Sequence, residues 1–170
     1  DVLGSRGLGD VYKRQFPDVP MDAWYRNELG YCVQAGIITG RPDGNFAPME
    51  SIDRGELAAM AARFLELANS GSTSAFADVP ASYWAHGYIA QLAEKGIVNG
   101  NGQGLYLPTE AISRAETVRI VNGILDRRPG QADEATLDRL AAAGAFIDLN
   151  KTHWAYYEIL EATYDHQHQK

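Results

Sequence analysis

Apolar residues recur every three or four positions in two stretches of the chain, and this spacing predicts two amphipathic helices. One helix is predicted over residues 54–68 and the other over residues 114–125. The apolar face of the first contains Leu57, Ala61, Phe64, Leu65 and Ala68, and that of the second contains Val118, Val121 and Leu125. Short helices such as these cannot form a closed hydrophobic core alone, so we expect them to pack against other parts of the chain.

Both helices begin with the sequence pattern of a capping box. Asp53 is followed three residues later by Glu56, and Ser113 is followed three residues later by Glu116. In such a box the glutamate accepts a hydrogen bond from the backbone N–H of the N-cap residue, which stabilises the helix by on the order of 1 kcal/mol. We therefore interpret both glutamates as structural caps.

The capping boxes place an arginine, Arg54 or Arg114, at the first position of each helix. A cation there faces the positive end of the helix dipole, which is unfavourable by about 0.3 to 1 kcal/mol unless an anion lies nearby. One explanation is an anion site in which the guanidinium and the free backbone N–H groups bind a ligand carboxylate. The other is an ion pair within the chain, and its candidate partners are Glu50, Glu110, Asp18 and Asp78. The spacing alone leaves both explanations open.

The chain contains an internal repeat. The segment that starts at Phe16 aligns without a gap on the segment that starts at Phe76, at a constant offset of 60 residues. A third copy starts at Phe146, 70 residues further on, and only its first half is present. Because this half copy has no second helix, we expect some of its apolar residues to be partly covered at best. These residues are Tyr157, Ile159 and Leu160.

Each full copy is predicted to fold as a helix, a turn-rich loop and a second helix, with short extended segments in the loop around Phe46 and Tyr106. The first helix should start at a good N-cap residue, carry a tryptophan in its first turn and end at a glycine. These positions are Asp22, Ser82 and Thr152 for the cap, Trp24, Trp84 and Trp154 for the tryptophan, and Gly36 and Gly96 for the end.

The sequence thus predicts an all-α fold of tandem helix-loop-helix repeats. Residues 1–15 have no counterpart elsewhere in the chain, and we expect them to be non-native or disordered. The other predicted parts are a first repeat over 16–69, a linker over 70–75, a second repeat over 76–128, a linker with a short helix over 129–145, and a truncated third repeat over 146–170.

Charge and composition exclude some classes of function. The formal net charge is −7 and no block of lysine or arginine occurs, so we expect no nucleic-acid partner. An anionic ligand would have to be bound by local cations. No apolar run approaches the roughly 20 residues that a membrane span requires, so we expect no membrane insertion. The single cysteine, Cys32, cannot form an internal disulfide.

The repeated motifs resemble those of S-layer homology domains. They are Phe-x-Asp-Val followed by Trp, then Gly-x-Pro-Asp-Gly-x-Phe-x-Pro, then Ile-x-Arg-x-Glu, with a period near 60 residues. The second copy lacks the Pro-Asp-Gly of the second motif, so its loop is expected to be looser. The resemblance covers Phe16 to about Gln167. It implies repeats packed around a pseudo-threefold axis, with binding grooves between them. It also implies an extracellular location, in the cell wall or S-layer of Gram-positive bacteria, and non-covalent binding to a secondary cell-wall polysaccharide. That polymer commonly carries a pyruvate ketal, and therefore a carboxylate.

The resemblance also implies ligand-binding roles for one set of residues, and it favours ligand binding for the two arginines. The set is Arg54, Arg114, Trp24, Trp84, Trp154, Asp18, Asp78, Asp148, Gly40 and Gly100. A tryptophan could stack on a sugar face, although a tryptophan in the first turn of a helix is more often part of a core. The aspartates could accept hydrogen bonds from sugar hydroxyls or cap a loop. The glycines could allow close approach of the sugar or end a turn.

The copies depart from one another in ways that affect these roles. The second copy has Ser113 before its arginine, whereas the first has Asp53, whose negative charge would weaken anion binding at Arg54. The half copy has no such arginine. If each groove needs an arginine from one repeat and a tryptophan from a neighbour, we expect two equipped grooves at most.

Other functions find less support in the sequence. An enzyme would need convergent acids, bases or nucleophiles, for which the best candidates are His86, His153, His166 and His168. His166 and His168 could bind a metal, but we interpret them as part of a polar tail. We therefore expect no catalysis, no metal and no cofactor. The remaining alternative is a structural module that contacts another protein or self-associates in an S-layer.

Overall fold

The computed structural model describes residues 16–69, 73–131, 133–142, 144 and 146–165. Over these residues the chain forms six helices and no strand, which confirms the predicted all-α class. The helices are α1 (Arg26–Gln34), α2 (Arg54–Phe64), α3 (His86–Glu94), α4 (Arg114–Ile124), α5 (Glu134–Ala141) and α6 (Tyr156–Thr163). The predictions for residues 1–15 and for the tail histidines fall outside the described residues.

The chain divides into two compact units, and the boundary lies between Ser51 and Ile52, inside the first sequence repeat. The N-terminal unit contains α1 and the loop that follows it. Both carboxylate oxygens of Asp18 accept backbone N–H groups of this loop, from Phe46 at 3.0 Å and from Ala47 at 2.6 Å. These hydrogen bonds, the one to Phe46 above all, lower the pKa of Asp18. The Asp18 side chain therefore links the segment before α1 to the loop after α1.

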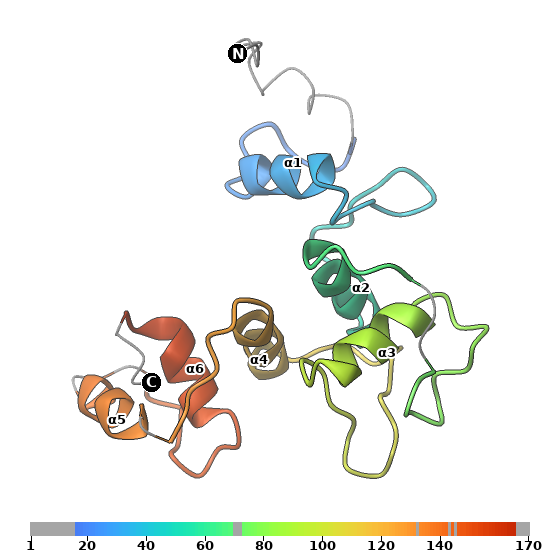
Figure 1. The fold of residues 1–170 in the computed structure, drawn as a ribbon. Helices are drawn as coiled ribbons and strands as arrows, with labels where there is room; N and C mark the ends of the chain where they lie inside the picture. Colours follow the sequence, from blue (N-terminus) through green and yellow to red (C-terminus); the bar gives the residue numbers. More distant parts are fainter. Residues whose placement is uncertain (1–15, 70–72, 132, 143, 145, 166–170) are drawn as a thin grey trace, which may run out of the picture. The chain divides into compact units, whose positions relative to one another are not determined.

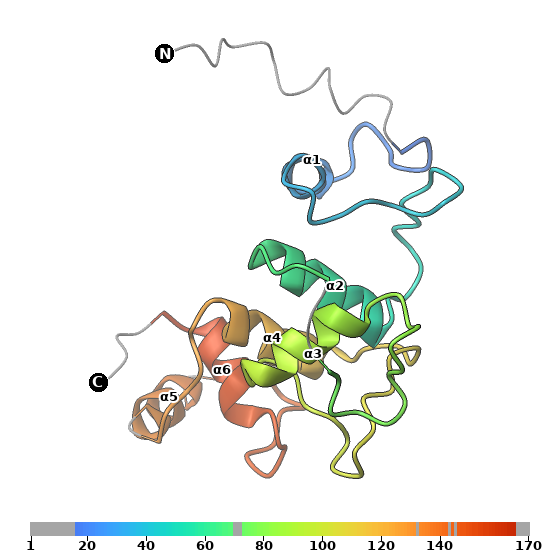
Figure 2. The same ribbon diagram turned by 45° about the vertical axis from the view of Figure 1, so that its right-hand side comes forward.

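In the second unit the helices pair between repeats. Helix α2, from the first repeat, packs against α3 of the second, and α4 of the second repeat packs against α6 of the third (Figures 1 and 2). The interface of α2 and α3 is the main core, where Ala58, Ala61 and Ala62 contact larger buried residues. Those larger residues include Val79, Ile89, Leu92, Ile97, Val98, Tyr106 and Ile120. The small side chains on α2 allow α3 to approach closely, so neighbouring repeats share one core.

The predicted N-caps of the first helices are wrong by about one helical turn. Helix α3 begins at His86 rather than near Ser82, and the shift is the same in α1 and α6. Two successive turns precede it, with hydrogen bonds from Tyr83 N to Pro80 O at 2.8 Å and from His86 N to Tyr83 O at 3.0 Å. The His86 ring also bonds the carbonyl of Val79 at 3.0 Å. These turns satisfy the backbone before the helix starts, so each tryptophan lies just ahead of its helix.

Helix α2 ends at Phe64, four residues before the predicted end. Glu66 adopts a positive φ of 56°, and the backbone N–H of Leu67 donates to the carbonyl of Ala62 at 2.9 Å. A left-handed residue followed by this hydrogen bond closes a helix as a Schellman motif. The apolar periodicity continues past Leu65, but the helical backbone conformation ends at Phe64.

The first helix of the half copy is better covered than expected. Leu160 of α6 is 0% exposed, because α6 packs against both α4 and α5. The expectation of partial cover is wrong for Leu160, whereas Tyr157 and Ile159 are half-buried. The short helix α5 supplies Leu137, which is also fully buried. The segment between the second and third repeats thus takes a place in the core.

We expect Gly55→Ala to lower the free energy of unfolding by about 1–2 kcal/mol, because overpacking at this position outweighs the gain of about 0.5–1 kcal/mol in helix propensity. Gly55 is the second residue of α2, and a Cβ there would lie 2.5 Å from the Tyr83 hydroxyl and 3.1 Å from the Pro108 carbonyl oxygen. Urea unfolding would measure the change. In a Tyr83→Phe background the loss should shrink, since the hydroxyl is gone. A Gly55→Ala variant more stable than the parent would contradict the packing.

Candidate functional site

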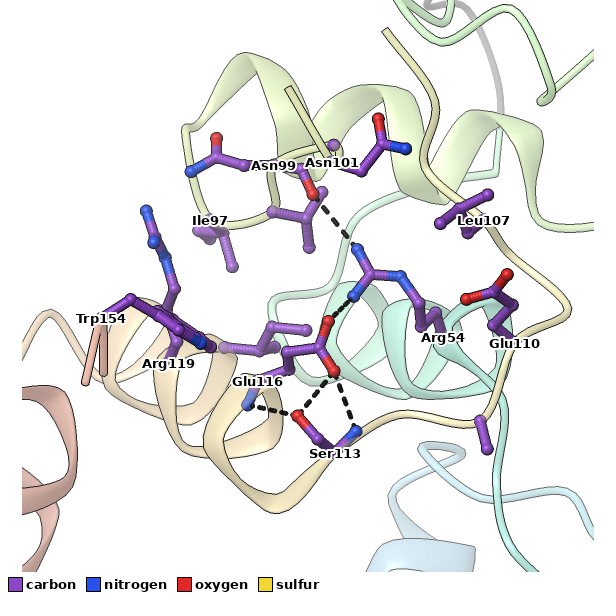
Figure 3. Close-up of a pocket in the computed structure, with 14 residues that line it drawn as sticks. Arg54, Ile97, Asn99, Asn101, Leu107, Glu110, Ser113, Glu116, Arg119 and Trp154 are labelled. Carbon is purple, nitrogen blue, oxygen red and sulfur yellow. Dashed lines mark hydrogen bonds and ion pairs between the residues drawn. The ribbon is translucent and has the colours of Figure 1, made fainter. Parts of the chain in front are cut away.

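An open pocket of about 630 Å³ lies within the second unit (Figure 3). Its walls come from α2, the loop after α3, α4 and the turn that precedes α6. The apolar lining includes Ile97, Val98, Leu107 and Ile120. The polar and aromatic lining includes Arg54, Asn99, Asn101, Glu110, Ser113, Glu116, Arg119 and Trp154. All three repeats contribute residues, so the pocket forms only when the repeats pack.

Arg54 is held by the second repeat. Its Nε donates to the carbonyl of Tyr106 at 2.7 Å, and its Nη2 donates to the carbonyl of Asn99 at 3.2 Å. Its Nη1 forms an ion pair with Glu116. The guanidinium also lies 4.7 Å from the centre of the Tyr106 ring, and the side chain is only 13% exposed. The carboxylate partner of this arginine is therefore Glu116, which is none of the four considered from the sequence.

Glu116 has two tasks. As the third residue of α4 it completes a capping box, accepting hydrogen bonds from Ser113 N at 2.9 Å and Ser113 Oγ at 2.6 Å, and the same box is present at Asp53 and Glu56. Burial raises the pKa of Glu116, but the Ser113 hydrogen bonds and the Arg54 guanidinium outweigh this effect and lower it. Glu116 is thus ionised and links two repeats. The sequence showed the cap but not the ion pair, whose partners are 62 residues apart.

Asp78 fastens the loop of the second repeat as Asp18 fastens that of the first. Its two oxygens accept hydrogen bonds from Tyr106 N at 2.8 Å and Leu107 N at 2.7 Å. Tyr106 is fully buried, which raises the pKa of its hydroxyl, and this hydroxyl donates to the Arg54 carbonyl at 3.0 Å. Asp148, the matching residue of the third repeat, is exposed. In both full repeats the aspartate therefore shapes the loop.

The two predicted glycines make room for the protein's own rings. A Cβ at Gly100 would lie 2.5 Å from the Leu105 carbonyl oxygen and 2.8 Å from the Phe76 ring. A Cβ at Gly40 would lie 2.2 Å from the Phe16 ring. Gly100 also lines the pocket.

The pocket brings together three of the predicted ligand residues, namely Arg54, Gly100 and Trp154. Trp84 and Arg114 belong to the same unit but do not line the pocket. Arg114 is exposed at the start of α4, and its side chain has no ion pair within the described part of the chain. Trp24 belongs to the N-terminal unit and is largely exposed.

Sequence reasoning missed Arg119. Its guanidinium carbon lies 5.9 Å from the centre of the Trp154 ring, within the range of a cation–π contact. The side-chain amide of Asn99 is assigned the orientation in which both its oxygen and its nitrogen have hydrogen-bond partners. In this orientation the amide oxygen accepts a hydrogen bond from Arg119 Nη2 at 2.7 Å. One signal was available: the matching residue of the first repeat, 60 positions earlier, is Ala59. The pocket-lining arginine of the second copy therefore has no counterpart in the first copy.

The residues that line the pocket are apolar, polar, charged and aromatic. The described residues contain no group of three or more histidine, cysteine, aspartate or glutamate side chains placed to hold a metal ion. None of their helices combines the length and apolar character needed to cross a membrane. The groups that line the pocket are guanidinium, carboxylate, amide and indole, which recognise ligands through charge, hydrogen bonds and stacking.

The fold and the pocket define a helical repeat module in which neighbouring repeats share a core and together line an open pocket. The S-layer homology domain matches the chain over residues 15–58 and 75–118, just over half of its length. The chain belongs to this family. It is a cell-surface anchoring module, located outside the cell in the cell wall or S-layer.

Similar proteins include surface-layer and anchoring proteins. The chain is 37% identical over 103 residues to S-layer protein EA1 of Bacillus anthracis, and the aligned region covers 60% of the chain and 12% of that protein. It is 34% identical over 111 residues to an S-layer protein of Bacillus licheniformis, covering 65% of the chain and 13% of that protein. It is 31% identical over 159 residues to a cellulosome-anchoring protein of Acetivibrio thermocellus, covering 90% and 33%. The chain thus spans a third or less of these relatives.

Proposed function

We propose that the pocket binds a carboxylate-bearing secondary cell-wall polysaccharide and so holds the parent protein non-covalently on the wall. The observation that carries the proposal is the placement of Trp154. Its indole is 56% exposed and lines a pocket whose other walls supply two guanidinium groups and the amides of Asn99 and Asn101. An exposed indole can cover the apolar face of a sugar ring while polar neighbours bind its hydroxyls.

Two further features support a polysaccharide rather than a small buried ligand. The pocket is partly open rather than an enclosed cavity, so a chain of sugars could enter and leave it. Its lining residues come from three repeats, and surfaces formed by stacked repeats are suited to extended ligands. The names of the relatives, two S-layer proteins and a cellulosome-anchoring protein, agree with a role in surface attachment.

The proposal is tested by co-sedimentation with purified Gram-positive wall sacculi, before and after chemical removal of the secondary polysaccharide. We expect the protein to pellet with intact sacculi and to stay in solution with stripped ones. Trp154→Ala should weaken binding about tenfold, which corresponds to about 1.4 kcal/mol.

The matched control for this variant is Phe64→Ala. Phe64 is 47% exposed, close to the exposure of Trp154, and does not line the pocket, so its removal should leave wall binding unchanged. Equal pelleting with stripped sacculi would instead favour the alternative of a module that contacts protein or self-associates. An equal loss of wall binding in Trp154→Ala and Phe64→Ala would show that the pocket is not the binding site.

A further inference from the structure

We infer that Arg119, and not Arg54, is the residue of this pocket that pairs with the carboxylate of the bound polysaccharide, while Trp154 supports the adjoining sugar. The inference rests on the proposed function, since it names the anion-binding group of the same site. It follows from the charges that line the pocket and from a difference between the repeats.

The charge of Arg54 is already compensated. Its ion pair with Glu116 and its hydrogen bonds to the carbonyls of Tyr106 and Asn99 engage all three nitrogens of the guanidinium. A second carboxylate, Glu110, lines the pocket on the Arg54 side of Glu116 (Figure 3). A ligand anion at this end would lie near two negative side chains as well as Arg54, and their repulsion would weaken its attraction to Arg54.

The other end of the pocket has the opposite character. Figure 3 shows Arg119 and Trp154 together on the far side of Glu116 from Arg54. The contacts of Arg119 are the Trp154 ring and the neutral amide of Asn99, and no carboxylate pairs with it within the described residues. The Asn99 hydrogen bond fixes the side chain, so a carboxylate could bind the remaining N–H groups without first ordering a flexible arginine.

Comparison of the repeats shows that the helix can form without an arginine at this position. The equivalent junction one repeat earlier joins α2 to α3, and there Ala59 and Trp84 stand where Arg119 and Trp154 stand. Ala59 is buried and packs normally, so the fold does not need an arginine at this position. The arginine therefore adds a cation beside one tryptophan and leaves the other without it.

The test measures the affinity of the full chain for purified sacculi that carry their secondary polysaccharide, and for the same sacculi after carbodiimide amidation of their carboxylates. Arg119→Gln should bind native sacculi at least tenfold more weakly than the parent, and Arg119→Lys should recover part of the loss. On amidated sacculi the parent and Arg119→Gln should bind equally weakly. Thermal unfolding of each variant checks that the fold is intact.

Arg63→Gln is the matched control, because Arg63 also lies over a ring, that of Tyr88 at 5.5 Å, but does not line the pocket. It should bind as the parent does. If the parent binds native sacculi and Arg119→Gln binds equally well, the inference is overturned and the proposed function stands. The inference is likewise overturned if Arg119→Gln loses as much affinity on amidated sacculi as on native ones. If the parent does not bind native sacculi, the proposed function itself fails.

Discussion

Replacing Arg54 with alanine is expected to lower the free energy of unfolding by about 2–4 kcal/mol, because it leaves the carboxylate of Glu116 half-buried without its cation. The full cost of breaking a buried pair would be about 3–5 kcal/mol, and the partial exposure of Glu116 reduces it. The hydrogen bonds from Arg54 to the carbonyls of Tyr106 and Asn99 are lost as well. Urea unfolding followed by circular dichroism measures the change.

Arg114 provides the control, since it holds the same first position in α4 and is exposed. Arg114→Ala should change stability little, or raise it by about 0.3–1 kcal/mol through removal of a cation from the helix N-terminus. Equal destabilisation by the two substitutions would show that the Arg54 contacts contribute nothing. The difference also affects binding experiments, because a loss of wall binding in Arg54→Ala would follow from disruption of the pocket wall.

Replacing Leu160 with alanine is expected to destabilise the second unit by about 2–5 kcal/mol, the range for truncating a fully buried leucine. Leu160 lies on α6, which packs against α4 and α5, so the cavity would open where three elements meet. Ile147→Ala, in the same repeat, removes a fully exposed apolar side chain and should have almost no effect. Thermal and urea unfolding of both variants measure the contrast.

If Leu160→Ala were as mild as Ile147→Ala, α6 would not be part of the core, and the sequence-based expectation of poor cover would be restored. The outcome also matters for the pocket. Trp154 lies two residues before α6, so the placement of its indole depends on how firmly α6 is held.

Helix starts were predictable from sequence where the interactions that set them are local and unopposed. The starts of α2 and α4 at Arg54 and Arg114 are as predicted, because a capping box is made within four consecutive residues. The start of α3 was misplaced because Ser82 looks like an N-cap, while the backbone there is used by turns at Tyr83 and His86. An N-cap hydrogen bond at Ser82 and the backbone hydrogen bonds of the turns are alternatives, and the sequence alone does not show which of them forms.

The candidate site was predicted only in part, because its contacts are not local. Arg54 and Trp154 were singled out from their repeated motifs, and both line the pocket. Arg119 was not, because it belongs to no repeated motif and its role depends on what lies across from it. The place of Arg119 beside Trp154 requires α4 and α6 to pack, and nothing within either segment indicates that contact.

By itself, the sequence determined the repeat, the helical class, the capped helix starts and the family, since each depends on residues that are neighbours along the chain or recur at a constant offset. Only the tertiary structure decided that α2 pairs with α3 and α4 with α6, that Glu116 compensates Arg54, and that Arg119 meets Trp154. The physical reason is that a short amphipathic helix accepts any complementary apolar partner. Which partner it takes, and which charges then meet, is settled by the packing of the whole unit.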